Sequence, residues 1–216
     1  MPTTTDIVLP CLDEAAALPW VLARIPPSAR AIVVDNGSRD GSAAIARDLG
    51  ATVVRCTVPG YGAACHAGLE AASAKYVAVC DCDASIDPRV VESFVTGLAH
   101  ADLAVARRRP VSPTAWPLPG RFANRVLARR VSRRGRVRLS DIGPLRVGRR
   151  DALLSLDVRD RRCGYPVETV LRAAAAGWRV VQIDVAYHPR IGTSKVTGTI
   201  SGYLRAVRDM SAVLSA

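Results

Sequence analysis

Two hydrophobic patterns alternate along this chain. Short apolar runs, which are typical of buried strands, are followed by segments in which apolar residues recur at helical spacing. Four strand-then-helix units in succession predict a parallel sheet with right-handed crossovers. The expected strands are 6–9, 31–34, 52–55, 76–80, 103–106, 144–148 and 179–185. The expected helices are 18–25, 42–49, 62–73, 87–99, 121–132, 151–156, 166–176 and one that starts at 199.

The regular alternation breaks between residues 107 and 143. This stretch is rich in proline and arginine, and we expect it to run over the surface with one helix near 121–132. No internal repeat and no linker divides the chain. With 216 residues, of which 49% are hydrophobic, it can bury a substantial core. We therefore expect one α/β domain, residues 1–216.

The chain is strongly basic, with a formal net charge of +11. Lys75 and Lys195 are its only lysines, so arginine carries nearly all of the excess. Such a charge implies an anionic partner: a nucleotide, a nucleic acid or an acidic membrane surface. Aromatic residues make up 5% of the chain and offer few platforms for base stacking, so we expect no nucleic acid. A non-catalytic protein that binds an anionic membrane or a nucleic acid stays an alternative.

The predicted helix 121–132 has the composition of a helix that lies on a membrane surface. It places Phe122, Val126 and Leu127 on one side with arginines around them. Arg130 falls within the apolar sector, and a solvated basic helix is the alternative. No segment reaches the ~18 apolar residues of a membrane span, and the first residues lack the pattern of a secretory signal. We expect a cytoplasmic protein that can associate peripherally with the inner face of the membrane.

Two carboxylates, Asp81 and Asp83, follow the apolar run 76–80 directly. Ligands of open α/β sheets gather beyond the carboxyl ends of such strands. Carboxylates at this spacing supply hard oxygen ligands to Mg²⁺ or Mn²⁺, so the pair predicts a site for one of these ions. A zinc site at Cys82 is disfavoured because no second Cys/His pair is found. The six cysteines lie mostly in apolar runs, which indicates reduced thiols.

Four segments in this order resemble motifs of the family-2 glycosyltransferases, which have the GT-A fold. They are 8–14, 32–41, 60–62 and 81–83. The later segments 165–168 and 190–195, with Gly177, are similar to the dolichol- and polyprenyl-phosphate sugar synthases. The resemblance implies a mostly parallel central sheet with helices on both faces. It also implies a metal-dependent, inverting transfer of a sugar from a nucleotide-diphosphate sugar.

The resemblance further implies where the donor binds. The loop after the first strand would cradle the base, Glu14 would reach the ribose or the base edge, and Asp35 or Asn36 would contact the base. Many members carry Asp where Asn36 stands, so UDP and GDP both stay open. At Gly62, free N–H groups at the start of a helix would favour negative charge, and Arg107 would face the diphosphate. The implied nucleotide-sugar-binding residues are Pro10, Leu12, Glu14, Asp35, Asn36, Gly62, Asp81, Cys82 and Arg107.

The implied acceptor is a polyprenyl phosphate. Its oxygen is already ionised near neutral pH, so catalysis requires positioning and charge neutralisation rather than a general base. If the acceptor is instead a soluble hydroxyl compound, Glu168 or Asp141 would have to remove its proton. A helix N-terminal carboxylate is the other reading of Glu168. The implied catalytic residues are Asp83, Glu168, Arg190 and Lys195, and the implied acceptor-phosphate ligands are Arg146, Arg190, Ser194 and Lys195.

Two other enzyme classes share parts of this pattern. A nucleotidyltransferase should show a glycine-rich loop with Arg and Lys after the first strand, where this chain has 10–14 without them. A Rossmann dehydrogenase should show Gly-x-Gly-x-x-Gly at the same point, and this chain lacks that motif there. Both are therefore disfavoured.

Overall fold

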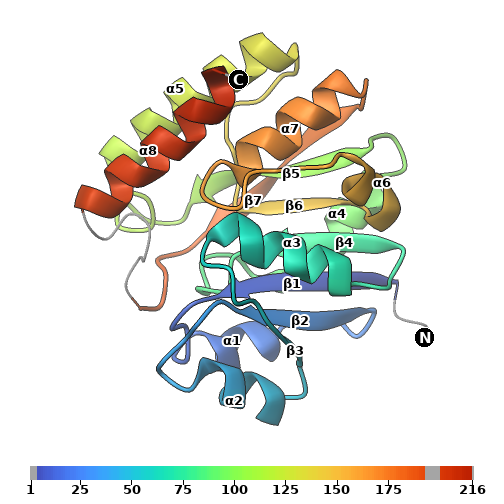
Figure 1. Cartoon of the computed structure of the whole chain (residues 1–216), viewed down its shortest axis with the longest axis vertical. Helices are drawn as coiled ribbons and strands as arrows, with labels where there is room; N and C mark the ends of the chain where they lie inside the picture. The colour runs from blue at the N-terminus through green and yellow to red at the C-terminus, as the bar shows by residue number, and fades with distance from the viewer. Residues whose placement is uncertain (1–3, 193–199, 216) are drawn as a thin grey trace.

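A seven-stranded sheet forms the middle of the molecule (Figure 1). The computed structural model of the chain describes residues 4–192 and 200–215. In sheet order, the strands are β3 (Thr52–Arg55), β2 (Ala29–Asp35), β1 (Thr5–Cys11), β4 (Tyr76–Cys80), β6 (Leu145–Arg149), β5 (Leu103–Pro110) and β7 (Val180–Tyr187). β6 runs antiparallel to both of its neighbours, and the other neighbouring strands are parallel. The expected mostly parallel α/β sheet is confirmed.

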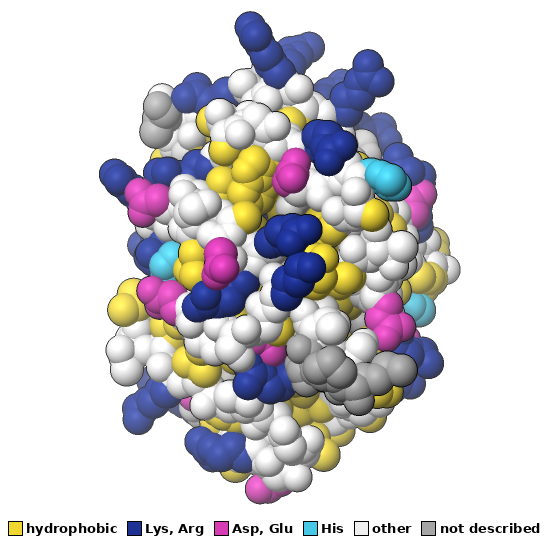
Figure 2. All heavy atoms as spheres, turned by 90° about the vertical axis from the view of Figure 1, so that its right-hand side faces the viewer, with side chains coloured by type: hydrophobic (Ala, Val, Ile, Leu, Met, Phe, Trp, Pro, Cys, Tyr) yellow, Lys and Arg dark blue, Asp and Glu magenta, His cyan; other side chains and the backbone are white. Residues whose placement is uncertain are grey.

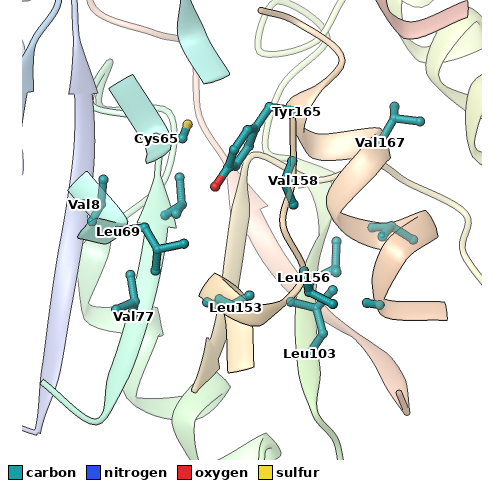
Figure 3. Packing of buried hydrophobic residues seen from close by; sticks show 14 of the residues in the cluster. Val8, Cys65, Leu69, Val77, Leu103, Leu153, Leu156, Val158, Tyr165 and Val167 are labelled. Carbon is teal, nitrogen blue, oxygen red and sulfur yellow. The ribbon is translucent and has the colours of Figure 1, made fainter. Parts of the chain in front are cut away.

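Helices cover both faces of this sheet (Figure 1). They are α1 (Leu18–Leu22), α2 (Ser42–Asp48), α3 (Tyr61–Ala71), α4 (Val91–Gly97) after the short 3₁₀ turn η1 (Pro88–Val90), α5 (Leu118–Gly135), α6 (Arg150–Ser155), α7 (Tyr165–Ala175) and α8 (Ile200–Ser215). Alternate side chains of the strands feed two apolar clusters, one under α1 and α4 and the other under α3, α6 and α7. Figure 3 shows the second, in which Leu69, Leu153 and Val167 belong to one cluster with Val77 and Leu103.

β5 is longer than its apolar run predicts. The expected strand ends at residue 106, whereas β5 continues to Pro110 because β7 pairs with it along its whole length. The polar extension is stabilised by charge, since Arg107 and Arg109 both pair with Asp184 of β7. The segment that leads to α5 therefore leaves the sheet after residue 110 rather than after residue 106.

A buried carboxylate fixes the start of β1. Asp6 is fully buried and accepts two hydrogen bonds of 2.9 Å from Arg30 of β2. It also accepts the backbone N–H groups of Ser73 and Ala74, at 2.7 and 2.9 Å. Burial raises the pKa of Asp6, but these hydrogen bonds lower it by more, so its pKa lies below the ordinary value. This cluster lies at the end of the strand opposite to the acidic pair.

α5 forms where the sequence predicts a surface helix, and it extends beyond 121–132 at both ends. α5 and α8 lie side by side at one end of the molecule (Figure 1). In the described part of the chain, no helix combines the length and the apolar character needed to cross a membrane.

Candidate active site

The candidate site lies at the carboxyl edge of the sheet, where β1, β2 and β4 end side by side. The loops after β1 and β2 are tied to each other, because the backbone N–H groups of 13–15 donate to the side chains of Ser38, Ser42 and Asp40 at 2.9–3.0 Å. Asp35 fixes the second loop by accepting the N–H of Ser38 at 3.0 Å. The two expected donor-binding loops therefore form one rigid rim.

Asp81 is the last acceptor of a hydrogen-bonded chain that runs from Arg146 through Tyr61. The Tyr61 hydroxyl donates to Asp81 Oδ1 at 3.0 Å, and the Arg146 guanidinium donates to the Tyr61 oxygen at 3.1 Å. Burial first, and then the charge of Asp83, raise the pKa of Asp81 to about 6. The charges of Arg146 and Arg190 act in the opposite direction. The site thus gathers two carboxylates and two guanidinium groups.

Asp83 joins the end of β4 to the segment that follows β7. Its side chain is 4% exposed, and Oδ1 accepts the N–H of Ser85 at 3.0 Å. Oδ2 lies 2.5 Å from the Arg190 guanidinium. The Ile191 N–H donates to the Asp83 carbonyl at 2.9 Å, which fixes the course of the segment. Two of the residues predicted to act in catalysis, Asp83 and Arg190, are therefore in direct contact.

The remaining donor-loop residues border this centre. The Cys82 thiol is buried and donates to the carbonyl of Pro10 at 3.1 Å, so the two predicted residues link β4 to β1. Leu12 is partly exposed. A Cβ atom added to Gly192 would lie 3.9 Å from Glu14 Oε2, so the Glu14 side chain reaches the segment after β7. Ser194 and Lys195, which the resemblance assigns to phosphate binding, lie outside the described residues.

Asn36 holds the loop that leads to α3. Its side-chain amide donates to the carbonyls of Cys56 and Val58, at 3.1 and 2.7 Å, and its oxygen accepts the N–H of Gly60 at 2.8 Å. These bonds engage both ends of the amide. Asp35, by contrast, uses its Oδ1 oxygen to accept the N–H of Ser38 in its own loop.

The N-terminus of α3 does not offer the free N–H groups that the sequence predicts. The carbonyls of Arg162 and Arg161 accept the N–H groups of Gly62 and Ala63, at 3.0 and 2.8 Å. A Cβ atom on Gly60, whose φ is +142°, would lie 2.1 Å from the Arg161 carbonyl oxygen. The prediction that these N–H groups await an anion was therefore wrong, because a distant loop caps the helix and the glycines make room for it.

The partner of Arg107 is Asp184, which does not belong to the acidic pair. Arg107 pairs with Asp184 on β7, and this hydrogen bond, with a second from Arg109, lowers the pKa of Asp184 to about 2. The charges that act on Asp81 come instead from Arg146 and Arg190. The structure thus brings Arg146 to the site, as a buried residue that also donates to the Gly143 carbonyl at 2.6 Å.

The carboxylates of Glu168 and Asp141 both accept hydrogen bonds from backbone N–H groups and arginines. Glu168, in the first turn of α7, accepts the N–H groups of Arg159 and Asp160 at 3.0 and 2.6 Å and lies 2.5 Å from Arg172. Burial raises the pKa of Glu168, but these partners lower it by more. Both oxygens of the buried Asp141 accept from Arg108, at 2.6–3.0 Å.

Sequence reasoning did not find the role of Tyr61. The residue was visible between Gly60 and Gly62, but its aromatic ring gave no sign that its hydroxyl bridges Asp81 and Arg146. An aromatic residue at the first position of a helix, beside a glycine cap, is only a weak sequence signal for a functional role.

Asp81 and Asp83 are the residues best suited to hold a divalent cation. The described residues contain no group of three or more His, Cys, Asp and Glu side chains in metal-binding geometry. Protein ligands would therefore come from two carboxylates, and water and substrate oxygens would complete the shell, as is common for Mg²⁺.

Comparison with known proteins agrees with this geometry. Residues 6–156 match the model of a family described as glycosyl transferase family 2. The chain belongs to this family. An uncharacterized glycosyltransferase of Mycobacterium tuberculosis is 50% identical to the chain over 214 residues, which is 97% of each protein. The predicted class of enzyme, a glycosyltransferase, is confirmed.

More distant relatives carry more specific names. A polyprenol monophosphomannose synthase of Mycolicibacterium smegmatis is 28% identical over 90% of this glycosyltransferase and 82% of its own length. Among solved structures, glucosyl-3-phosphoglycerate synthase of M. tuberculosis, in complex with Mn²⁺, UDP and glucosyl-3-phosphoglycerate, has a TM-score of 0.77 at 22% identity. The alignment covers 98% of this chain and 78% of that one. The structural match confirms the GT-A fold.

Proposed function

We propose that this glycosyltransferase moves a sugar from a nucleotide-diphosphate sugar to a polyprenyl phosphate, with Mg²⁺ or Mn²⁺ bound by Asp81 and Asp83. The names of two relatives support the lipid acceptor: the mycobacterial polyprenol monophosphomannose synthase and a dolichyl-phosphate hexose transferase of Haloferax volcanii, 26% identical over 88% of the chain. The Mn²⁺ and UDP in the structural neighbour support the cation and the donor. We place the reaction at the inner face of the membrane, where such an acceptor is found.

One observation favours a phosphate over a hydroxyl acceptor. A hydroxyl acceptor needs a carboxylate to take its proton, and the two residues considered for this, Glu168 and Asp141, are both engaged by backbone N–H groups and arginines. The lowered pKa of Glu168 makes it a weaker base still. An ionised lipid phosphate needs no base, so it fits the chemistry available at this edge of the sheet.

The acidic pair fits a divalent cation. Burial first, and then the neighbouring charge of Asp83, disfavour the ionised form of Asp81 and raise its pKa, and the charges of Arg146 and Arg190 offset this only in part. A bound cation would supply the charge neutralisation that the departing diphosphate requires. Its remaining ligand positions would be taken by diphosphate oxygens and water.

Of Arg190 and Arg107, we propose Arg190 as the cation that binds phosphate oxygens. It already lies against Asp83, whereas Arg107 would have to leave Asp184 before it could reach the diphosphate. Arg190 would then bind and orient phosphate groups, while Asp81 would be held in place through Tyr61. Attack in line with the leaving diphosphate inverts the anomeric centre. Asp35 and the backbone of 10–14 are proposed to bind the nucleoside.

A three-arm transfer assay tests this function. The protein is incubated with Mn²⁺ or Mg²⁺ and a panel of UDP- and GDP-sugars, with a short-chain polyprenyl phosphate, with phosphoglyceric acid as a soluble acceptor, or with neither. We expect nucleotide release above the acceptor-free rate in the polyprenyl phosphate arm, with a glycosylated lipid as product and no turnover after chelation. Faster release with phosphoglyceric acid would support the soluble-acceptor alternative and overturn the lipid proposal.

A further inference from the structure

The outward face of α5 carries large apolar side chains in solvent. Leu118, Phe122 and Val126 recur every four residues and are 74%, 71% and 37% exposed. Leu118 and Phe122 are the most exposed large apolar residues in the described part of the chain. Their spacing places them on one stripe of the helix, so the N-terminal half of α5 presents an apolar ridge.

The same helix carries six arginines without partners in the part of the chain that the structure describes. They are Arg121, Arg125, Arg129, Arg130, Arg133 and Arg134. Among the described residues, none of them makes an ion pair or a side-chain hydrogen bond, whereas four arginines elsewhere in the chain are paired with wholly or largely buried carboxylates. Figure 2 shows Lys and Arg side chains projecting from the end of the molecule at which α5 and α8 lie. The C-terminal half of α5 is therefore an unneutralised basic surface.

A groove between α5 and α8 extends this surface. Its volume is about 470 Å³, and its lining combines three guanidinium groups with two hydroxyls. The lining residues are Arg130, Arg133, Arg134, Ser211, Leu214 and Ser215. The three guanidinium groups and the Ser211 hydroxyl around one hollow are suited to a phosphate group, whereas the Ser215 hydroxyl donates to the Ser211 carbonyl at 3.1 Å.

The apolar ridge begins on the side of the sheet that carries the acidic pair. β5 is parallel to β4, because both are antiparallel to β6, so the two strands end at the same edge. Residues 111–117 lead from the end of β5 directly into α5. The ridge therefore starts from the edge of the sheet that carries the acidic pair.

We propose that α5 docks on an anionic lipid bilayer, with the apolar ridge inserted among the lipids and the groove holding one lipid phosphate headgroup. This inference rests on the proposed function in one respect, since a bilayer would present the polyprenyl phosphate to the site. Charge complementarity favours an anionic surface, and the ridge favours a bilayer over a nucleic acid, which offers no apolar interior. Insertion of Phe122 and contact of the arginines with headgroups require the same orientation of the helix.

Vesicle co-sedimentation tests the proposal without any sugar transfer. The full chain is mixed with vesicles of phosphatidylcholine alone or with 30 mol% phosphatidylglycerol, and we expect binding to the second kind that weakens as NaCl rises. The groove variant Arg130→Gln/Arg133→Gln/Arg134→Gln should bind about a hundredfold more weakly. Phe122→Ser should lose about tenfold. The matched control Arg47→Gln/Arg55→Gln/Lys75→Gln removes the same charge from exposed positions outside α5 and α8 and should lose no more than a few-fold.

Other outcomes would overturn the proposal. An equal loss in the control and groove variants would mean that net charge alone attracts the protein. Binding of a short single-stranded RNA that depends on the groove arginines, together with vesicle binding that is indifferent to Phe122→Ser, would make α5 a nucleic-acid surface. Thermal unfolding of each variant excludes misfolding, and because all substituted residues are exposed, we expect no change. Transfer to a short-chain acceptor, measured separately, should be the same in the variants and the wild type. If the wild type binds anionic vesicles but transfers no sugar to this acceptor, the proposed function is refuted and the docking surface is not.

Discussion

The fold treats the arginines of the sheet and the arginines of α5 in opposite ways. Around the sheet, four arginines are matched to carboxylates that are themselves wholly or largely buried. These pairs are Arg30–Asp6, Arg108–Asp141, Arg172–Glu168 and Arg190–Asp83. On α5, six arginines have no such partner among the described residues. Removing a paired arginine leaves a buried charge uncompensated, whereas removing an unpaired one changes only the surrounding field.

This difference separates the two uses of positive charge in the protein. Paired arginines set the positions of strands, loops and the acidic pair, so their cost of removal should appear in stability or in catalysis. The six unpaired arginines of α5, a helix with no acidic residue, contribute +6 to the formal net charge of +11, so the cost of removing them should appear in binding to an anionic partner. Each prediction below tests one side of this division.

The largest effect is expected at the pair that belongs to the site. Asp83→Asn removes a carboxylate from the proposed cation site and leaves Arg190 without its partner, so the transfer rate should fall about a thousandfold. The matched control is Asp184→Asn, which also removes a carboxylate that pairs with arginines but lies outside the site. Nucleotide release measures both. An equal fall in transfer rate in the two variants would contradict the idea that the Asp83–Arg190 pair belongs to the site and the Asp184 pairs do not.

The next effect compares a paired arginine with an unpaired one. Arg108 donates to both oxygens of Asp141 and lies 3.8 Å from the Trp116 ring centre, so Arg108→Gln strands a buried carboxylate. We expect a loss of about 3 kcal/mol in the free energy of unfolding. Arg133→Gln should change it by less than about 0.5 kcal/mol. Urea unfolding measures both, and a loss at Arg133 similar to that at Arg108 would contradict the division.

The hydrophobic pattern was sufficient for the parts of the fold in which neighbouring residues decide the structure. The strands 52–55 and 76–80 form with the predicted bounds, because each is a short apolar run between turn residues. The pattern could not predict that β6 is antiparallel, since burial of alternate side chains is independent of strand direction. It also missed the polar extension of β5, which depends on pairing with β7.

The candidate site shows the same limit. Asp81 and Asp83 were predictable because they follow a buried strand directly. The contact between Asp83 and Arg190, and the capping of α3 by the carbonyls of 161–162, join segments that are far apart in the chain. Local pattern carries no information on such contacts. Sequence alone therefore could not assign the carboxylate partners of the paired arginines, even for Arg190, whose role at the site was expected.

A smaller effect is expected at the amino edge, where the pairing should depend on pH. The pKa of Asp6 is lowered in the folded protein, so its stabilisation is fully present above the unfolded value of about 3.9 and is lost as the pH falls through the lower folded value. At pH 7, Asp6→Asn should cost about 2 kcal/mol in the free energy of unfolding. This gap should close below about pH 4. Unfolding of both proteins between pH 7 and 3 measures it, and a constant gap would show that the charge of Asp6 is not its cause.

The smallest effect is expected at Glu168, whose role decides between the two acceptors. Glu168→Gln keeps the shape of the side chain but weakens its bonds to the N–H groups of Arg159 and Asp160 and its pairing with Arg172. We expect a loss of about 1 kcal/mol in the free energy of unfolding and a transfer rate within about threefold of the wild type. Arg172→Gln is the control, because it disturbs the same cluster and leaves the carboxylate in place. If Glu168→Gln abolishes transfer while Arg172→Gln does not, the carboxylate acts as a base, and the acceptor is a hydroxyl rather than a lipid phosphate.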